Sequence, residues 1–385
     1  MSDPAADRLA PPPAPPGARL FEDPAPFRTA FGAELPGFAL AYETWGTLSP
    51  GRDNAILLCT GLSASSHARS SAADPSSGWW ERMIGEGAAL DTSRYFVICT
   101  NVLGGCFGST GPASPSPEDG RPWGLRFPVV TVQDFVRAQA RLLDHLGIER
   151  LHAVVGSSMG GMQALALGAL FPARAARVVA ISAPGRSYPL SIALRFVQRQ
   201  AVMRDPLWSG GRYEPGLGPV EGLRLAREIG TISYRSGPEW DQRFGRERLR
   251  GTPTDVGPDF QVEAYLVRQG ERLAESGFDP NSFLYLSKAM DLFDLGEGAP
   301  SYEEGIARIH ARTLVVGVTT DLLFPIQQQE ELARILREAG REARFVRLDT
   351  VYGHDAFLID VDRFAAILQP FLDEPAPRRG GRPTG

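Results

Sequence analysis

The sequence of 385 residues has little cysteine, almost no lysine and no long apolar run. Lys288 is the only lysine among 40 basic residues, so arginine carries nearly all of the positive charge. The three cysteines (Cys59, Cys99 and Cys106) include no C-x-x-C pair, and two of them end apolar runs. Cys59 and Cys99 are therefore predicted to be reduced, buried thiols.

Other absences limit where the chain acts and what it binds. The sequence lacks a run of about 18 apolar residues, which is the length that a bilayer-spanning helix needs. It also lacks a basic region followed by an apolar stretch, the pattern of a secretory signal. The formal net charge of −5 gives no reason to expect nucleic acid or an anionic membrane as a partner. We therefore expect a folded protein of the reducing cytoplasm, and its 43% of hydrophobic residues is ordinary for one.

Short apolar segments alternate with helical patterns over most of the chain. We expect strands at 55–59, 95–99, 151–156, 177–183, 313–318 and 343–349, and helices at 132–147 and 327–340. Thr131 is expected to cap the first of these helices. The alternation predicts an α/β fold with a mostly parallel central sheet flanked by helices.

The spacing of the strands and the composition of the ends predict the domain organisation. Pro/Gly-rich ends indicate disordered tails at 1–20 and 375–385. About 130 residues separate the strand at 177–183 from the one at 313–318, although a crossover needs only about a dozen. The expected division is an α/β core of 21–185 and 301–374, with a helical lid insertion of 186–300.

The strongest local motif is the stretch GSSMG (156–160), which fits the pattern G-x-S-x-G. It follows the apolar run at 151–156 and precedes a helical stretch, as the nucleophile elbow of the α/β-hydrolase fold requires. This turn holds a serine Oγ above the sheet at a helix N-terminus, and the N–H of Met159 would face a developing oxyanion. Ser158 is therefore the candidate nucleophile. The alternative is a Gly-rich strand end without a catalytic role.

A base and an orienting carboxylate are expected beyond later strand ends, in the order Ser, Asp or Glu, His. Asp321 ends the pattern TLVVGVTTD, and His354 lies in the loop YGHDAF after the last expected strand. His354 would take the proton from Ser158, and Asp321 would hold the tautomer of His354 and stabilise its imidazolium. The rival carboxylates are Asp349, Asp355 and Asp360. His145 and His152 flank the strand before the candidate nucleophile and are interpreted as structural, and His310 precedes a strand.

The loop GLSASSH (61–67) follows the first expected strand, where this fold takes its second oxyanion N–H. Leu62 is the expected donor. His67 is expected to cap a turn in this loop rather than to act in catalysis. No further His or Cys stands at ligand spacing to His354 and Asp355, so no metal is expected.

Four stretches resemble the homoserine O-acetyltransferase family, CoA-dependent acyltransferases on an α/β-hydrolase scaffold. They are NVLGGCFGSTGPAS (101–114), GSSMGGMQAL (156–165), TTDLLFP (319–325) and YGHDAFLID (352–360), and the likeness covers nearly all of 35–372. The resemblance implies that Ser158 accepts an acyl group from acyl-CoA and passes it to an amino-acid hydroxyl by a ping-pong route. Acyl-CoA would be a co-substrate, with no bound cofactor.

The same resemblance places the substrate-binding residues at Arg227, in LAREIGTISYRS, and at Asp355. An arginine suits the carboxylate of an amino-acid zwitterion, and a carboxylate suits its ammonium group. Without the resemblance, Arg227 would be interpreted as a solvated arginine of a lid helix. The family also implies a homodimer, formed through the lid helices.

Two departures from the family pattern bear on the substrates. Where the family has A-L-T-G, this chain has Gly61, Leu62, Ser63 and Ala64. The methyl group added at Ala64 could shorten the acceptor pocket, which hints at serine rather than the longer homoserine; one methylene is worth only about 1–3 kcal/mol of discrimination.

The second departure concerns the acyl donor. Relatives that use succinyl-CoA tend to place an arginine two residues after the triad aspartate. This chain has Leu323 there, which favours acetyl-CoA. Arg186 and Arg195, just beyond the strand at 177–183, remain alternative sources of a charge for a succinyl carboxylate.

The expected activity is transfer of an acyl group, acetyl by preference, to L-homoserine or L-serine in methionine or cysteine biosynthesis. A serine O-succinyltransferase of the same family is the alternative within this class. A serine esterase is the alternative enzyme class, and the large insertion and the Arg227/Asp355 pair argue against it. A non-catalytic binding protein is a third hypothesis, opposed by the intact triad order.

Overall fold

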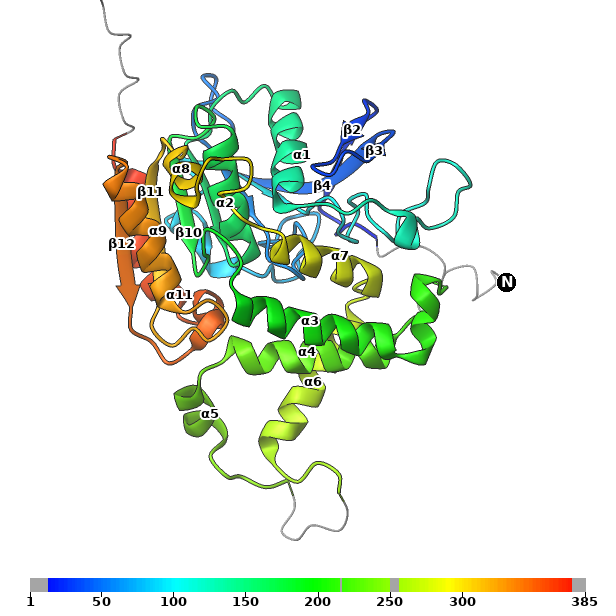
Figure 1. Ribbon diagram of the computed structural model, residues 1–385. Coiled ribbons are helices and arrows are strands. Elements are labelled where there is room, and N and C mark those ends of the chain that lie inside the picture. The colour runs from blue at the N-terminus through cyan, green and yellow to red at the C-terminus, as the bar shows by residue number, and fades with distance from the viewer. Residues whose placement is uncertain (1–12, 215–216, 250–255, 376–385) are drawn as a thin grey trace, which may run out of the picture.

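An eight-stranded sheet forms the centre of the computed structural model, which describes residues 13–214, 217–249 and 256–375 (Figure 1). In spatial order its strands are β1 (Arg19–Asp23), β4 (Phe38–Trp45), β8 (Phe96–Thr100), β5 (Ala55–Cys59), β9 (Ala153–Ser157), β10 (Arg177–Ile181), β11 (Arg312–Val318) and β12 (Ala343–Leu348). The six strands from β8 to β12 are parallel, while β4 is antiparallel to β8 and β1 to β4. The expected α/β fold with a mostly parallel sheet is confirmed.

The central strands form where the sequence has short aliphatic runs. All residues of β5, β9 and β10 are buried, because helices cover both faces of the sheet. Each of the six expected strands exists, with bounds within two residues of the prediction. The two antiparallel strands β1 and β4 were not anticipated.

Helices cover the two faces of the sheet. One face packs against α1 (Val132–His145), α2 (Met159–Leu170), α8 (Tyr302–Ala307) and α9 (Ile326–Glu338), and the other against η2 (Glu81–Met83) and α11 (Val361–Asp373). Thr131 caps α1 as expected, since its side chain accepts from Asp134 N and Asp134 bonds back to Thr131 N. The shorter elements are β2 (Phe27–Arg28), β3 (Glu34–Leu35), β6 (Ile84–Gly85), β7 (Leu90–Asp91), η3 (Gly124–Arg126), η5 (Gly353–Asp355) and α10 (Ala356–Ile359).

A group of helices occupies the chain between β10 and β11. They are α3 (Pro189–Arg204), η4 (Pro206–Gly211), α4 (Val220–Tyr234), α5 (Gly237–Phe244), α6 (Gln261–Glu275) and α7 (Pro280–Asp291). Figure 1 shows α3 and α4 side by side across one end of the sheet, and α6 packs on α4. An antiparallel bridge between Arg186 and Asp294 joins the two ends of this insertion.

Part of the segment predicted as an N-terminal tail has a defined structure. Residues 13–20 are described, and Arg19 and Leu20 begin β1, which pairs with residues 38–42 of β4. The composition predicted disorder because proline and alanine bury little surface, but pairing with β4 lets the following Phe21 enter the core. Residues 1–12 of the predicted N-terminal tail and 376–385 of the predicted C-terminal tail lie outside the described residues.

Candidate active site

A sharp turn between β9 and α2 presents Ser158. Its backbone has φ 55° and ψ −124°, which L-residues adopt at a cost and which is typical of strained functional turns. The glycines on either side allow the turn to close: a Cβ at Gly156 would lie 2.1 Å from the carbonyl oxygen of Gly160, and one at Gly160 would lie 2.2 Å from that of Cys59. The G-x-S-x-G pattern thus reflects a close approach of three backbone segments.

Ser158, His354 and Asp321 form a continuous hydrogen-bonded chain. The Oγ of Ser158 lies 2.8 Å from His354 Nε2, and His354 Nδ1 lies 2.7 Å from Asp321 Oδ2. The other oxygen of Asp321 accepts from the N–H groups of Leu323 and Phe324, at 2.9 and 2.8 Å. Because the carboxylate accepts from Nδ1–H, Nε2 is left as the acceptor for the serine hydroxyl. This arrangement can activate a serine nucleophile.

His354 is buried beside the charge of Asp321. Burial by itself lowers the pKa of His354, but the charge and the hydrogen bond of Asp321 outweigh it, so the pKa lies above the ordinary 6.5. The imidazolium that forms when Ser158 loses its proton is therefore stabilised. Aromatic rings of Phe324 and Phe357 pack edge-on against the imidazole and limit its rotation.

The two expected oxyanion donors, the N–H groups of Leu62 and Met159, come from two different segments of the chain. Met159 is the first residue of α2, so no preceding turn of its helix provides an acceptor for its N–H. Leu62 lies in the loop after β5 and lines the same cavity as Ser158. Its N–H has no hydrogen-bond partner among the described residues.

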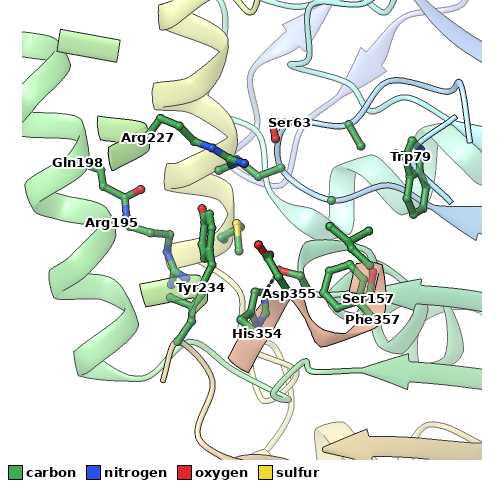
Figure 2. A pocket seen from close by; sticks show the side chains of 17 residues that line it. Ser63, Trp79, Ser157, Arg195, Gln198, Arg227, Tyr234, His354, Asp355 and Phe357 are labelled. Atoms are coloured by element: carbon green, nitrogen blue, oxygen red, sulfur yellow. Dashed lines mark hydrogen bonds between the residues drawn. The ribbon is translucent and has the colours of Figure 1, made fainter. Parts of the chain in front are cut away.

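A cavity of about 230 Å³ joins these groups to the inserted helices (Figure 2). The expected residues that line it are Gly61, Leu62, Ser63, Ala64, Ser158, Arg195, Arg227, Leu323, His354 and Asp355. Arg186 is not among the lining residues, because its guanidinium stacks on the ring of Tyr302, 4.0 Å from the centroid, at the base of the insertion. The structure therefore separates the two arginines that the sequence left as equivalent candidates.

The two residues expected to contact the substrate, Arg227 and Asp355, differ in whether their charges are already paired within the protein. Arg227 makes no ion pair among the described residues, its Nε is buried without a hydrogen-bond partner, and its guanidinium lies 5.4 Å from the ring of Tyr234. Asp355 is partly neutralised by Arg235, whose Nη2 lies 3.4 Å from Oδ2, although Arg235 is also paired with Glu239 at 2.9 Å. Asp355 can therefore still accept a cationic group.

Two polar side chains of the cavity were missed by the sequence analysis. Tyr234 and Gln198 line the cavity beside Arg227 and Arg195 (Figure 2). Their spacing held a signal, since Tyr234 follows Arg227 by seven residues and Gln198 follows Arg195 by three, which places each pair on one face of its helix. Neither Tyr234 nor Gln198 hydrogen-bonds to another described side chain.

The remaining candidates lie away from the nucleophile. Asp349 and Asp360 are near Arg347 and Arg363 respectively and do not line the cavity. His67 also does not line it; its ring is held by Glu43 and by the carbonyl of Ser76. His152 bonds to the carbonyl of Leu372, and the ring of His145 packs on Phe21. Within the described ranges, no group of three or more His, Cys, Asp and Glu could hold a metal.

Comparison with known proteins gives the family. The family described as the α/β hydrolase fold matches residues 54–361. A serine O-succinyltransferase of Litchfieldella anticariensis is 50% identical over 363 residues, which cover 93% of this chain and 99% of that protein. A homoserine O-acetyltransferase of Symbiobacterium thermophilum is 50% identical over 348 residues, covering 89% and 91%. The chain belongs to the homoserine O-acetyltransferase family of α/β hydrolases. It is an O-acyltransferase, as the sequence predicted.

Solved structures of other proteins have the same fold as the acyltransferase. The homoserine O-acetyltransferase from Bacillus anthracis matches with a TM-score of 0.86 at 30% identity and covers 94% of this chain and 99% of its own. Esterase E22 matches with a TM-score of 0.85 at 31% identity and covers 92% and 99%. Overall shape therefore does not separate transfer from hydrolysis, and the distinction must come from the cavity. Among the described residues of the acyltransferase, no helix is long and apolar enough to cross a membrane.

Proposed function

We propose that the acyltransferase moves a succinyl group from succinyl-CoA to the side-chain hydroxyl of L-serine, through a succinyl ester of Ser158. In the first half-reaction the Oγ of Ser158 attacks the thioester, His354 takes its proton, and the proton then leaves with the CoA thiolate. In the second, His354 takes the proton of the amino-acid hydroxyl as its oxygen attacks the ester, and it gives this proton to the Oγ of Ser158 when the ester bond to Ser158 breaks. Leu62 N–H and Met159 N–H would stabilise both oxyanions.

The observation that carries this proposal is the charge of the cavity wall. Arg195 is buried, and its Nε lies 2.6 Å from Asp291 Oδ1. The second oxygen of Asp291 is taken by Arg199, also at 2.6 Å. One carboxylate thus serves two guanidinium groups, and one positive charge of this cluster is left over.

The surplus charge lies at the wall of the cavity. Arg195 lines the cavity, and its Nη1 is buried with no hydrogen-bond partner among the described residues (Figure 2). A buried, unpaired charged donor is costly unless a ligand completes it. A carboxylate at the far end of the acyl group would do so, and an acetyl group would not.

The acceptor accounts for the remaining charges. An amino-acid zwitterion brings a carboxylate for the unpaired Arg227 and an ammonium group for Asp355. Serine plus a succinyl group therefore presents two carboxylates and one ammonium to two guanidinium groups and one carboxylate. We favour L-serine over L-homoserine because the methyl group of Ala64, in the loop Gly61–Ala64 that lines the cavity, would shorten the acceptor pocket.

Homologues support both donors. Serine O-succinyltransferases and homoserine O-acetyltransferases occur at the same 50% identity. The preference for acetyl-CoA inferred from Leu323 stays a prediction. Leu323 does line the cavity, but its side chain carries no charge, which leaves Arg195 as the charged group that would meet the acyl chain. Arg195 therefore favours the succinyl alternative.

We further propose that the enzyme acts in the cytoplasm in amino-acid biosynthesis, as a homodimer formed through the inserted helices. Large apolar side chains are exposed on α3, α4 and α6, which pack together: Leu190, Phe196, Val197, Leu225, Ile232 and Val267. Such a surface suits a protein interface. Light scattering would report a dimer, and substitution of Phe196 and Ile232 by Glu would give a monomer; a wild-type monomer would contradict the proposal.

A thiol-release assay tests the substrates directly by crossing succinyl-CoA and acetyl-CoA with L-serine and L-homoserine. We expect the highest kcat/KM for succinyl-CoA with L-serine. A preference for acetyl-CoA with L-homoserine would overturn the proposed donor and acceptor but keep the acyl-serine route. Cleavage of simple esters without thiol release from any pair would favour the esterase alternative.

A further inference from the structure

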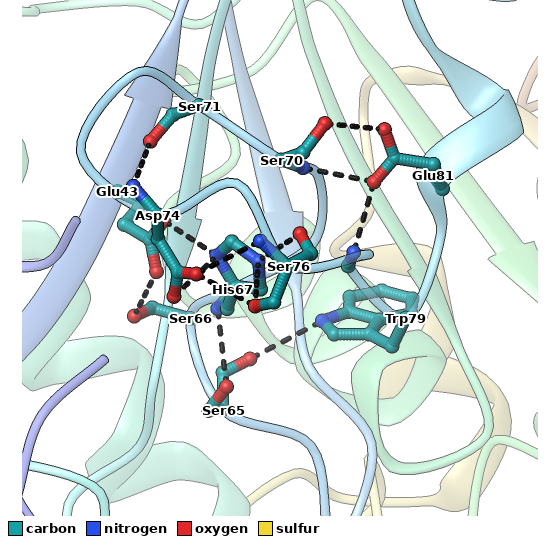
Figure 3. A network of polar contacts seen from close by, with 11 residues as sticks. Glu43, Ser65, Ser66, His67, Ser70, Ser71, Asp74, Ser76, Trp79 and Glu81 are labelled. Carbon is teal, nitrogen blue, oxygen red and sulfur yellow. Dashed lines mark hydrogen bonds and ion pairs between the residues drawn. The ribbon is translucent and has the colours of Figure 1, made fainter. Parts of the chain in front are cut away.

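Figure 3 shows a network of polar contacts around His67 that includes Trp79, a residue of the cavity wall. The loop of residues 61–80 connects β5 to η2, and its two ends, Gly61–Ala64 and Trp79, line the cavity. Between these ends lies His67, of which 8% is exposed. The catalytic account given above makes no use of it.

Each ring nitrogen of His67 faces a hydrogen-bond acceptor. The one hydroxyl nearby donates its proton to another group. Nδ1 lies 3.0 Å from Glu43 Oε2, on β4, and Nε2 lies 2.9 Å from the carbonyl oxygen of Ser76. The hydroxyl of Ser76 is 3.3 Å from Nε2, but it donates to Asp74 Oδ1 at 2.6 Å. A neutral imidazole has one N–H, so only the imidazolium satisfies both contacts.

The charges around His67 favour the same protonation state. Glu43 faces it from β4, and Asp74 Oδ2 from the loop lies 3.6 Å from Nδ1. Cys99, beside Glu43 on β8, adds no charge, because burial raises the pKa of its thiol well above the ordinary value. Burial lowers the pKa of His67. The hydrogen bonds to Glu43 and Ser76 and the two negative charges raise this pKa by more than burial lowers it, so the net shift is upward.

The network transmits the position of His67 to the cavity wall. The carbonyl of His67 accepts from Trp79 N at 3.2 Å, and the indole N–H of Trp79 donates to the carbonyl of Ser65 at 3.2 Å. The second oxygen of Glu43 accepts from the hydroxyl of Ser66 at 3.0 Å. Glu43 therefore holds Ser66 and His67 against β4, and two hydrogen bonds tie Trp79 to Ser65 and His67.

We propose that His67 is a positioning residue, held as an imidazolium between Glu43 and Asp74, that fixes the loop carrying Leu62 and Trp79 for acyl transfer. His67 does not touch substrate. Its positive charge keeps two buried carboxylates and two loop segments together, and the loop in turn places the Leu62 N–H for the oxyanion. The catalytic part of this inference rests on the proposed function, whereas the protonation state does not.

The protonation state is measured first, on the intact wild-type enzyme. Long-range proton–nitrogen NMR spectra, with His67 assigned by comparison with His67→Gln, should show both ring nitrogens protonated at neutral pH. His152 is the internal reference: burial lowers its pKa, so it should be neutral in the same spectrum. A neutral ring at His67 would overturn the inference whatever reaction the enzyme catalyses.

The positioning role is tested with His67→Gln and with the control His152→Gln, a histidine that bonds to the carbonyl of Leu372 away from the cavity. We expect His67→Gln to lower both kcat and the rate of Ser158 labelling by an organophosphate about 10- to 100-fold at a temperature where circular dichroism shows it folded. Outright loss of an oxyanion donor costs about 10²–10³. The control should keep both rates.

A double variant separates positioning from a general loss of stability. His67→Gln alone leaves the buried carboxylate of Glu43 facing a neutral side chain, and Glu43→Gln/His67→Gln removes that carboxylate. The melting temperature of the double variant should therefore be higher than that of His67→Gln, while its labelling rate stays low. If His67→Gln lowers only the melting temperature and keeps the labelling rate, His67 is a structural residue and the inference fails. Because labelling needs no acyl-CoA, this outcome is independent of the proposed substrates.

Discussion

The Oγ of Ser158 lies 2.8 Å from the Nε2 of His354, although the two residues are 196 positions apart in the chain. The parallel sheet creates this contact, because the ends of β9, β11 and β12 from which Ser158, Asp321 and His354 follow meet at one edge. The inserted helices then add their side chains over that edge. The proposed chemistry and the proposed substrate recognition thus involve different parts of the chain and can be tested separately.

The pH dependence of the first half-reaction should report His354. The base must be neutral, and Asp321 raises the pKa of His354, so kcat/KM for acyl-CoA should rise with pH through a value above about 6.5. Asp321→Asn removes the charge that raises this pKa. Its residual activity should be lower and its acid limb should move to lower pH; an unchanged limb would mean that another group titrates.

Arg195 should control the acyl donor. In Arg195→Met, Asp291 keeps its partner Arg199, so the variant should fold with a balanced ion pair. We expect kcat/KM for succinyl-CoA to fall about 100-fold, since truncating one member of a buried charge contact costs about 2–5 kcal/mol, while that for acetyl-CoA changes little or rises. Arg186→Met, outside the cavity, is the matched control. Equal losses with both donors would contradict a role in donor selection.

Arg227 should affect the acceptor and leave the first half-reaction intact. Arg227→Met should raise the KM for L-serine about 10- to 100-fold, because the carboxylate loses a charged partner, whereas the burst of CoA release should be unchanged. Arg224→Met provides a control on the same helix, where Arg224 is paired on the surface with Glu221. A slower burst in Arg227→Met would show that Arg227 binds the donor instead.

The loop at Gly61–Ala64 should set the length of the acceptor. Ala64→Gly removes the methyl group that separates this loop from the family pattern. The ratio of kcat/KM for L-homoserine to that for L-serine should rise about tenfold, within the 10- to 200-fold that one methylene is worth. The two acceptors measured on one variant control for general damage, and an unchanged ratio would mean that the pocket ends elsewhere.

The strands, and the three residues that form the hydrogen-bonded chain, could be selected from the sequence because both depend on local patterns. Ser158, Asp321 and His354 each follow an apolar run, and those runs form neighbouring strands. The roles assigned to Arg227 and Asp355 came from the resemblance, since a helix pattern does not say which face meets the sheet. The structure shows that both residues line the cavity.

Other features depended on tertiary contacts that no local pattern shows. Arg186 and Arg195 look alike in the sequence, and only the packing of Arg186 on Tyr302 separates them. The strand β1 follows a Pro-rich stretch and forms because β4 offers it an edge. The contacts of His67 join residues 43, 67 and 76, of which only one lies in the loop motif. In each case the partner is distant in sequence.

The most direct test of the central claim is the intact mass of the enzyme after incubation with succinyl-CoA and then with L-serine. We predict an increase equal to one succinyl group, located on Ser158 by peptide mapping and absent from Ser158→Ala, which is discharged quickly by L-serine and slowly by water. No adduct on Ser158, or discharge by water as fast as by L-serine, would contradict acyl transfer through this serine.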